Sequence, residues 1–526
     1  MKNASAHLDT FCSDSLPAVE LRPNLTCNDP TLSYPAMLNL GEVLLEGSIA
    51  RFGADRPCLI GPVETWTYGQ VRTLATQMAE ALTSRFSLVP GNRVMILGPN
   101  DAWYAITWLA VLRAGCVAVP ASPQLTAPEL ARLHLATRTD ALAISAALSD
   151  RTDLPAVPHA FYGGIAEGDL VRIAADCPGT QVPISTSSQD VAFLVSTSGT
   201  TGTPKVTAHF HHDLLYIADA WSAYALSTTP DDIFAGTPHL SFTYGLCSRL
   251  AMPLRHGAAT ILTAETSAKQ MVEAIGLHKA TVCVSSPTAY RAVAAMENHE
   301  QLSSLRVALS SGEGLAASTW RAFRQATGLE ILEALGTTEC TSTFTSNQPG
   351  DLRPGSVGRP LPAYRIRILD DMGNVLQPGE EGWLAVQGPT GCRYLNDDRQ
   401  KAYVIDGWNI TGDIFSQDRD GYLWFKGRND DLINAAGHKF YPAEIEEILL
   451  RSDLVHEGVI TRTPIAGTDI VTAVVVLSPG VPSDSATRGQ LIAFLAQHLA
   501  PYKIPRNIKF VGSIARTITG KLRRVS

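Results

Sequence analysis

Residues 196–205 read STSGTTGTPK, a run of hydroxyl-bearing and glycine residues that ends in Pro204 and Lys205. The run directly follows an apolar stretch, VAFLVS, that predicts a buried strand, and α/β sheets place their ligand sites at strand ends. Successive small residues let main-chain N–H groups converge on an anion, and Lys205 adds a positive charge. A plain polar loop is the alternative interpretation, because such clusters usually are loops. A P-loop of the form GxxxxGK[ST] is excluded, because Pro204 stands where that motif needs its second glycine.

Other polar groups could complete a nucleotide site with this run. Glu339 ends the segment GTTE, which follows the strand-like LEILEAL, and its carboxylate could hold a magnesium ion. Asp413 ends GWNITGD and could accept from both hydroxyls of a ribose, while Arg428 could pair with phosphate or ribose. Lys521 lies behind a glycine in TITGKLRR, on an expected exposed hairpin near the chain end. Each residue alone fits a loop, turn or tail, but their combined order and spacing are highly specific.

The elements that must position these residues follow from the hydrophobic pattern. Between about residues 40 and 340, apolar runs alternate with amphipathic helical segments, which predicts parallel sheets covered by helices on both faces. The predicted strands are 93–98, 117–121, 141–145, 191–196, 280–286 and 307–312, and the predicted helices include 68–82 and 127–136. Strands this uniformly apolar are typical of burial on both faces.

The pattern changes after about residue 355. The segments 364–370 and 382–388 alternate with the period of two that half-exposed antiparallel strands have. A polar turn, GRNDDLINAAGHK, is followed by a helix near Pro442, a strand at 471–478 and a helix at 488–500. The last hundred residues therefore predict a small separate α+β domain.

Composition limits the class of protein. A chain of 526 residues with 45% hydrophobic and 17% charged residues predicts a globular protein of two or more domains. Its net charge of −8 and lack of a basic block argue against nucleic-acid or anionic-membrane partners. The nine cysteines show no metal spacing or disulfide framework, which favours reduced thiols and a cytoplasmic location. The most apolar stretch, residues 102–112, is too short to span a membrane and predicts a buried helix.

With these motifs in place, the sequence resembles the adenylate-forming superfamily of acyl-CoA ligases, firefly luciferase and stand-alone adenylation domains. The resemblance covers residues 36 to 524. The segments AHFHHD, FTYGL, SSPTAY, GPTGCRYL and DGWNITGD look closest to benzoate- and 2-aminobenzoate-CoA ligases. The resemblance to this superfamily implies an α/β fold with a large N-terminal domain of two doubly wound sheets plus a distorted β-barrel, and a small mobile α+β C-terminal domain.

The resemblance implies two half-reactions. A carboxylate attacks the α-phosphate of ATP to give an acyl-adenylate and pyrophosphate, and a thiol, usually that of coenzyme A, then displaces AMP. Because an anion must approach a polyanion, the first step needs charge neutralisation and positioning. The catalytic residues implied are Lys521, which bridges α-phosphate and carboxylate, Glu339, which holds Mg²⁺, and Lys205 of the phosphate loop. The nucleotide-binding residues implied are Ser198, Gly199, Thr200, Thr201, Gly202, Ser311, Gly312, Glu313, Thr338, Asp413 and Arg428.

The resemblance also implies that the small domain moves. It swings about a hinge matching Asp430, and its second pose brings the loop around Gly437, with Lys439, to coenzyme A. A glycine there leaves room for the narrow pantetheine arm. The expected domains are a tail (1–35), a large domain (36–429) and a mobile domain (430–526). The expected ligands are ATP or AMP, Mg²⁺, coenzyme A and a carboxylic acid or its acyl-adenylate; a homodimer is left open.

Two departures from the family pattern carry hypotheses. Val206 follows Lys205 where the family usually has glycine, and Ala515 stands where it usually has proline. If residue 206 needed a positive φ, a β-branched side chain would cost on the order of 1–3 kcal/mol or displace the loop. We therefore expect a weakened ATP-dependent half-reaction, with thioester formation from a supplied acyl-adenylate retained. A small backbone shift that tolerates Val206 is the alternative.

A further departure from the family pattern lies in the acyl pocket. Ser342 and Thr343 replace a His and an Ile that are typical of benzoate ligases, so the pocket is larger. The expected acyl-pocket residues are Thr243, Tyr244, Ser286, Gly336, Ser342 and Thr343. We expect an acid bulkier than benzoate, polycyclic or substituted, with mixed polar contacts. Such a pocket hints at natural-product metabolism.

Three other functions stay open. A stand-alone adenylation enzyme that loads a carrier protein uses the same residues as a CoA ligase. A catalytically silent acyl- or nucleotide-binding homologue is kept open by Val206, although the presence of Glu339, Asp413, Arg428 and Lys521 argues against it. A P-loop hydrolase is disfavoured by Pro204.

Overall fold

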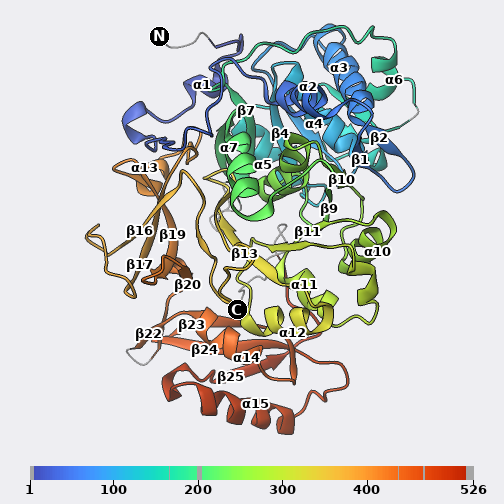
Figure 1. The fold of residues 1–526 in the computed structure, drawn as a ribbon. Helices are drawn as coiled ribbons and strands as arrows, with labels where there is room; N and C mark the ends of the chain where they lie inside the picture. The colour runs from blue at the N-terminus through green and yellow to red at the C-terminus, as the bar shows by residue number, and fades with distance from the viewer. Residues whose placement is uncertain (1–4, 165, 198–203, 436–437, 466–467, 517–526) are drawn as a thin grey trace.

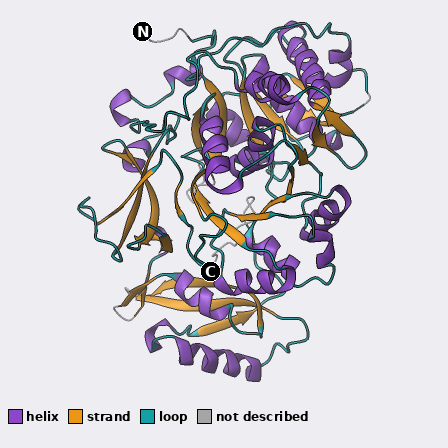
Figure 2. Ribbon diagram, in the orientation of Figure 1, coloured by secondary structure: helices purple, strands orange, loops and turns teal. Residues whose placement is uncertain are grey.

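The computed structural model describes residues 5–164, 166–197, 204–435, 438–465 and 468–516. The chain folds into a large lobe and a small C-terminal lobe, which lies at the bottom of Figure 1 in orange and red. The large lobe contains two mainly parallel sheets and one antiparallel sheet. Figure 2 shows most of the helices gathered around the parallel sheets. The predicted fold class is confirmed.

The first parallel sheet has six strands in the order β6-β5-β3-β4-β7-β8. Its strands are β3 (Arg93–Leu97), β4 (Val117–Ala121), β5 (Ala141–Ser145), β6 (His159–Tyr162), β7 (Val191–Thr197) and β8 (Lys205–Phe210). Nearby helices are α2 (Leu40–Phe52), α3 (Tyr68–Ser84), α4 (Ala102–Arg113), α5 (Ala127–Thr137) and α6 (Leu170–Ala175). Every residue of β3, β4 and β5 is buried, as their apolar sequences predict. Only β8 runs antiparallel, paired with β7.

The second parallel sheet has nine strands in the order β15-β14-β13-β12-β11-β9-β10-β1-β2. Its strands are β1 (Pro57–Ile60), β2 (Thr65–Thr67), β9 (Ile233–Gly236), β10 (Ala259–Ile261), β11 (Val282–Ser285), β12 (Val307–Ser310), β13 (Ile331–Gly336), β14 (Thr343–Ser346) and β15 (Arg359–Pro360). Associated helices are α7 (Asp213–Trp221), α8 (Thr243–Gly245), α9 (Met252–Arg255), α10 (Ala268–His278), α11 (Pro287–Ala294) and α12 (Ala317–Thr327). The central strands are parallel, so their carboxyl ends share one edge.

The antiparallel sheet occupies the left of Figure 1. It contains β16 (Arg365–Leu369), β17 (Glu381–Gln387), β18 (Val404–Ile405), β19 (Trp408–Gln417) and β20 (Leu423–Arg428), and the helix α13 (Gln400–Tyr403) precedes β18. The predicted antiparallel pairing of the first two strands is confirmed. Half-exposure holds for β16 but not for β17, which is mostly buried because it lies between β16 and β19.

The small lobe has its own hydrophobic core. It contains β21 (Ile433–Ala435), β22 (His438–Phe440), β23 (Val455–Ile465), β24 (Thr468–Leu477), β25 (Asn507–Phe510), α14 (Pro442–Leu449) and α15 (Ser485–His498). Its core includes Ile445, Ile460, Val475 and Leu491. The chain enters this lobe through a single 3₁₀ turn, η6 (Asn429–Asp431).

The first residues and the apolar helix both pack on the large lobe. Asp9 pairs with the buried Arg93 at 2.6 Å, and Cys12 of α1 (Phe11–Asp14) is buried. All of α4 except Trp103 is buried, so the prediction of a buried helix is confirmed. In the described part of the chain, no helix combines the length and apolarity that crossing a membrane requires.

Candidate active site

Three predicted segments meet at the carboxyl edge of the second sheet. Ser286 follows β11, residues 311–313 follow β12, and residues 336–339 contain the end of β13 and the turn after it. Because these strands are adjacent and parallel, the three segments share the edge where α/β sheets bind ligands. Gly312 has a φ of +91°, in the region that favours glycine. At Gly336 a Cβ would lie 2.1 Å from the carbonyl oxygen of Ser342, so only glycine allows this approach.

Glu339 is joined to Lys205 through Tyr394. The Tyr394 hydroxyl donates to Glu339 Oε1 at 2.5 Å, and Lys205 Nζ lies 5.6 Å from the centre of the Tyr394 ring. Burial and the neighbouring Glu339 carboxylate raise the pKa of Tyr394, so the hydroxyl stays a proton donor. The main chain fixes this arrangement, because Leu395 N donates to the Val206 carbonyl at 2.9 Å.

Val206 does not have the strained backbone that the sequence hypothesis required. It belongs to β8, is paired with Ser196, and is not among the described residues with a positive φ. Its side chain is buried at 3% exposure in the core of the first sheet, where a β-branched residue is favourable. The expectation of strain at this position is therefore wrong, because the residue continues a regular strand.

A buried ionic cluster lies next to the segments that carry Lys205 and Tyr394. Asp213 is fully buried and accepts from Arg393 Nη1 at 2.8 Å and from Phe210 N at 3.0 Å. His212 Nδ1 lies 2.9 Å from the other carboxylate oxygen of Asp213. Burial opposes ionisation, but Arg393 and His212 outweigh it and hold the pKa of Asp213 well below its usual range.

The same cluster reaches the turn that carries Glu339. His209 Nδ1 lies 3.0 Å from Thr341 Oγ1, and burial lowers the pKa of His209 to about 3, so the ring is neutral. Thr341 is fully buried and has a φ of +73°, which is unfavourable for a β-branched residue. Strained backbone of this kind concentrates at functional sites. Here Thr341 lies between Glu339 and Ser342 in a turn closed by Thr341 N, which donates to the Thr338 carbonyl at 3.0 Å.

The predicted ribose-binding pair comes from the antiparallel sheet. Asp413 of β19 and Arg428 of β20 are cross-strand partners, and Asp413 Oδ1 lies 3.3 Å from Arg428 Nη1. Burial works against the charge of Arg428, but Asp413, Asp431, Asp430 and Glu339 raise the pKa of Arg428 above its ordinary value. The structure thus brings Glu339 of the parallel sheet within electrostatic range of Arg428.

The predicted acyl-pocket residues gather hydroxyl groups in the interior. Thr243 and Tyr244 form the start of α8, while Ser342 and Thr343 lie on the other side of the close contact at Gly336. Within the described ranges, the hydroxyls of Tyr244 and Thr343 are buried without a hydrogen-bond partner, and the buried hydroxyl of Ser342 contacts the Cys247 thiol. Ser286 instead caps α11, accepting from Ala289 N at 3.3 Å.

Some predicted residues cannot be placed, and others were missed. Residues 198–202, Gly437 and Lys521 lie outside the described residues. Thr338 lies in the turn before Glu339, Asp430 lies in η6, and Lys439 is exposed on β22. The sequence analysis assigned no role to Asp213, Arg393 and Tyr394, although AHFHHD and GPTGCRYL contain them. Their pairing is long-range, so only those two motifs could have signalled it.

Comparisons with known proteins agree with this geometry. Residues 45–393 match the family model described as AMP-binding enzyme, and residues 444–521 match that of the AMP-binding enzyme C-terminal domain. Benzoate–CoA ligase from Thauera aromatica is 28% identical over 94% of this chain and 96% of its own length. The 3-hydroxybenzoate–CoA ligase from Aromatoleum sp. (strain CIB) is 30% identical over 93% and 96%. The structure of anthranilate CoA ligase AuaEII with anthranoyl-AMP superimposes with a TM-score of 0.87 at 29% identity, covering 93% and 96% of the two chains.

Enzymes of this kind use ATP, Mg²⁺ and coenzyme A, and the residues present fit these groups. Magnesium at ATP sites is held by one or two carboxylates together with phosphates. The carboxylate of Glu339 would fit such a site, and the described residues contain no group of three or more His, Cys, Asp or Glu side chains placed to hold a metal ion. The exposed ammonium of Lys439 suits an anionic group of coenzyme A. This chain therefore belongs to the family of AMP-binding enzymes and is an adenylate-forming ligase of the acid–thiol class.

Proposed function

We propose that this enzyme converts an aromatic or polycyclic carboxylic acid bulkier than benzoate, through its acyl-adenylate, into the CoA thioester. The relatives named above act on benzoate and 3-hydroxybenzoate or hold anthranoyl-AMP, which supports an aromatic acid. Ser342 and Thr343 are small side chains in the predicted pocket, which supports a larger one. The domain division at residues 429 and 430 belongs to the same proposal.

The observation that carries the substrate proposal is the set of buried hydroxyls. A buried hydroxyl without a partner costs about 1–3 kcal/mol, and native proteins rarely leave one unsatisfied. In the described part of the chain, Tyr244 and Thr343 each bury such a group, and Ser342 buries a hydroxyl that contacts only the weakly hydrogen-bonding Cys247 thiol. Burial raises the pKa of the neighbouring Cys247 thiol to about 12, although its contact with Ser342 opposes the rise. The part of the predicted pocket next to Cys247 is therefore uncharged. An acid with hydroxyl, keto or amino substituents would supply the missing partners.

The proposed roles of the chain's residues follow from charge. Lys205 and Lys521 neutralise negative charge while the carboxylate approaches ATP, which an anion–polyanion reaction requires. Glu339, whose carboxylate accepts from the Tyr394 hydroxyl, would hold a magnesium ion, which would neutralise phosphate charge when bound. Asp413 and Arg428 bind the ribose, and residues 311–313 lie along the adenine. Removal of Lys521 from the site then frees space for the thiol of coenzyme A.

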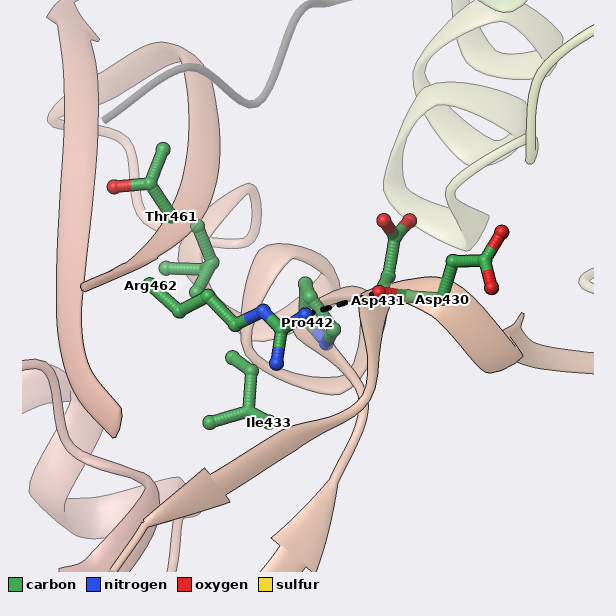
Figure 3. Close-up of a pocket in the computed structure, with 7 residues that line it drawn as sticks. Asp430, Asp431, Ile433, Pro442, Thr461 and Arg462 are labelled. Atoms are coloured by element: carbon green, nitrogen blue, oxygen red, sulfur yellow. Dashed lines mark hydrogen bonds between the residues drawn. The ribbon is translucent and has the colours of Figure 1, made fainter. Parts of the chain in front are cut away.

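The hinge proposal is supported by contacts around η6. Arg462 of β23 donates to the carbonyl of Leu432 at 2.9 Å. It also donates to the carbonyl of Asp430 at 3.2 Å (Figure 3). The carboxylates of Asp430 and Asp431 point away from the guanidinium, and a cavity of about 250 Å³ lies beside the turn (Figure 3). Because the Asp430 carbonyl is tied to the small lobe, rotation of that lobe is left to the φ and ψ of Asp430 and the bonds before it.

The test of the proposed function is a panel of acids with separate readouts for pyrophosphate and for CoA thioester. We expect substituted or polycyclic aromatic acids to give higher kcat/KM than benzoate in both readouts. Benzoate as the best substrate would contradict the pocket argument. Pyrophosphate release without consumption of free coenzyme A would favour a carrier-protein thiol instead.

Val206→Gly tests whether the first half-reaction is weakened. With no strain at Val206, displacement of the preceding loop is the remaining route to a weak step. We expect the variant to lose about 2–3 kcal/mol of unfolding free energy, because a buried valine is removed from a strand. We expect no gain in pyrophosphate release with ATP and acid. A clear gain relative to acyl-CoA formation from synthetic acyl-adenylate would instead show that Val206 impairs adenylation.

A further inference from the structure

Charged residues from both lobes meet beside the predicted adenine segment. The small lobe contributes Glu457 of β23 and Arg516, whose carboxylate Oε1 and guanidinium Nη2 lie 2.5 Å apart. Arg516 Nη1 lies 3.4 Å from Thr288 Oγ1 on α11 of the large lobe. Thr288 in turn donates to Glu313 Oε2 at 3.1 Å. A continuous polar chain therefore crosses from the small lobe to the nucleotide site.

The electrostatics of Arg291, also on α11, support the same grouping. Burial lowers the pKa of Arg291, the carboxylates of Glu457 and Glu313 oppose that change, and the positive charge of Arg516 adds to it. These four charged residues come from four separate segments, two in each lobe. The two carboxylates and the two guanidinium groups together carry no net charge, which suits a contact that can form and open.

Arg516 makes one contact within the small lobe and one contact with the large lobe. Its pairing with Glu457 lies within the small lobe and ties the segment that ends at Arg516 to β23. Its contact with Thr288 crosses to the large lobe. Rotation of the small lobe about Asp430 would preserve the first contact and break the second. The Arg516 side chain is thus held on the small lobe by Glu457 and contacts the large lobe across the interface.

The position of Arg516 matters for the proposed chemistry. Arg516 precedes Lys521 by five residues, and five extended residues span at most about 18 Å. Thr288 is the second residue of α11, the helix that Ser286 caps, and Glu313 follows Ser311 and Gly312. A contact between Arg516 and Thr288 therefore limits the distance of Lys521 from the site.

We propose that Arg516 and Glu457 are positioning residues that, through Thr288 and Glu313, hold the small lobe in the pose for adenylate formation. This inference rests on the proposed two-step function. Opening of the contact would accompany the change to the thioester-forming pose. Arg516 acts through the placement of Lys521 and touches neither substrate in this role.

The test compares the two half-reactions in three variants. Arg516→Met and Thr288→Val each remove one side of the crossing contact, and Thr288→Val leaves the segment with Lys521 unchanged. Arg506→Met removes an exposed arginine of the small lobe that has no described ion pair and serves as the matched control. We expect about tenfold slower pyrophosphate release for Arg516→Met and a smaller loss for Thr288→Val, within the usual range of coupling between sites. Acyl-CoA formation from synthetic acyl-adenylate should be unchanged or faster in both.

Further readouts separate positioning from loss of fold. Arg516→Lys should recover part of the pyrophosphate rate, and the KM for ATP should change less than kcat. Equal losses in both half-reactions, or no loss in either crossing variant, would overturn the inference. Hydrogen exchange of α11 and β23 needs no turnover, and faster exchange in Arg516→Met but not in Arg506→Met is expected. If wild type releases pyrophosphate but makes no CoA thioester, the proposed function fails, while the comparisons of pyrophosphate release and of hydrogen exchange still decide the inference.

Discussion

Replacing Lys521 with methionine is expected to slow pyrophosphate release from ATP and acid by about 10²–10³-fold, the usual cost of removing one preorganised charge from a reacting centre. The methylene stem is retained, so the loss reports the ammonium group. Acyl-CoA formation from synthetic acyl-adenylate should stay close to the wild-type rate, because that step needs the lysine to be away from the site. The measurement is the ratio of the two rates in the same enzyme preparation.

Lys509→Met is the matched control for that experiment. Lys509 is an exposed lysine of β25 in the same lobe, so its replacement changes the net charge equally without touching the proposed site. We expect both half-reactions of this control to match wild type. A comparable loss in both half-reactions of Lys521→Met would contradict the proposal that Lys521 acts only in the pose for adenylate formation.

The second large effect concerns stability. Asp213→Ala is expected to lower the free energy of unfolding by about 3–5 kcal/mol, because it leaves the buried charge of Arg393 without its counter-ion. Arg393 is 1% exposed and Asp213 is fully buried, so water cannot compensate. Urea unfolding followed through the buried Trp108 and Trp221 would report the large lobe.

Two comparisons make this prediction specific. Adding Arg393→Met to Asp213→Ala should recover part of the loss, because removal of both partners leaves no unpaired buried charge. Glu447→Gln neutralises a carboxylate whose pair with Arg451 is on the surface, and should cost only about 0–1 kcal/mol. Asp213→Ala as mild as Glu447→Gln would show that the cluster is not essential to the fold. Since the pKa of Asp213 is held below its unfolded value, its stabilising effect is present near neutral pH and is lost as acid protonates the folded carboxylate.

The order of strands and helices could be read from local pattern. Uniformly apolar runs became the buried strands β3, β4 and β5, because parallel strands are covered on both faces. The same reasoning failed for β17, whose alternating sequence suggested exposure. Its burial depends on the two strands that flank it, and neighbours in a sheet are not a local property.

The candidate site likewise contains residues that the sequence identified and residues that only the structure revealed. Glu339, Asp413 and Arg428 were identified from motifs; the structure pairs Asp413 with Arg428 at 3.3 Å, and Glu339 contributes to the raised pKa of Arg428. Tyr394 was missed, because its contact with Glu339 joins residues 55 positions apart. The hypothesis about Val206 was wrong in its premise, because the sequence motif suggested a loop where hydrogen bonding continues a strand.

The sequence by itself determined the alternation of elements, the family motifs and the types of residue available for adenylate chemistry. These depend on side-chain periodicity and on short motifs, which act over a few neighbouring residues. Only the tertiary structure decided that Asp213 and Arg393 form a buried pair, that the hydroxyls of Tyr244 and Thr343 are buried without a partner, and that Arg516 reaches Thr288 across the lobes. Such contacts depend on which distant segments pack together and exclude water, and a linear pattern does not specify that.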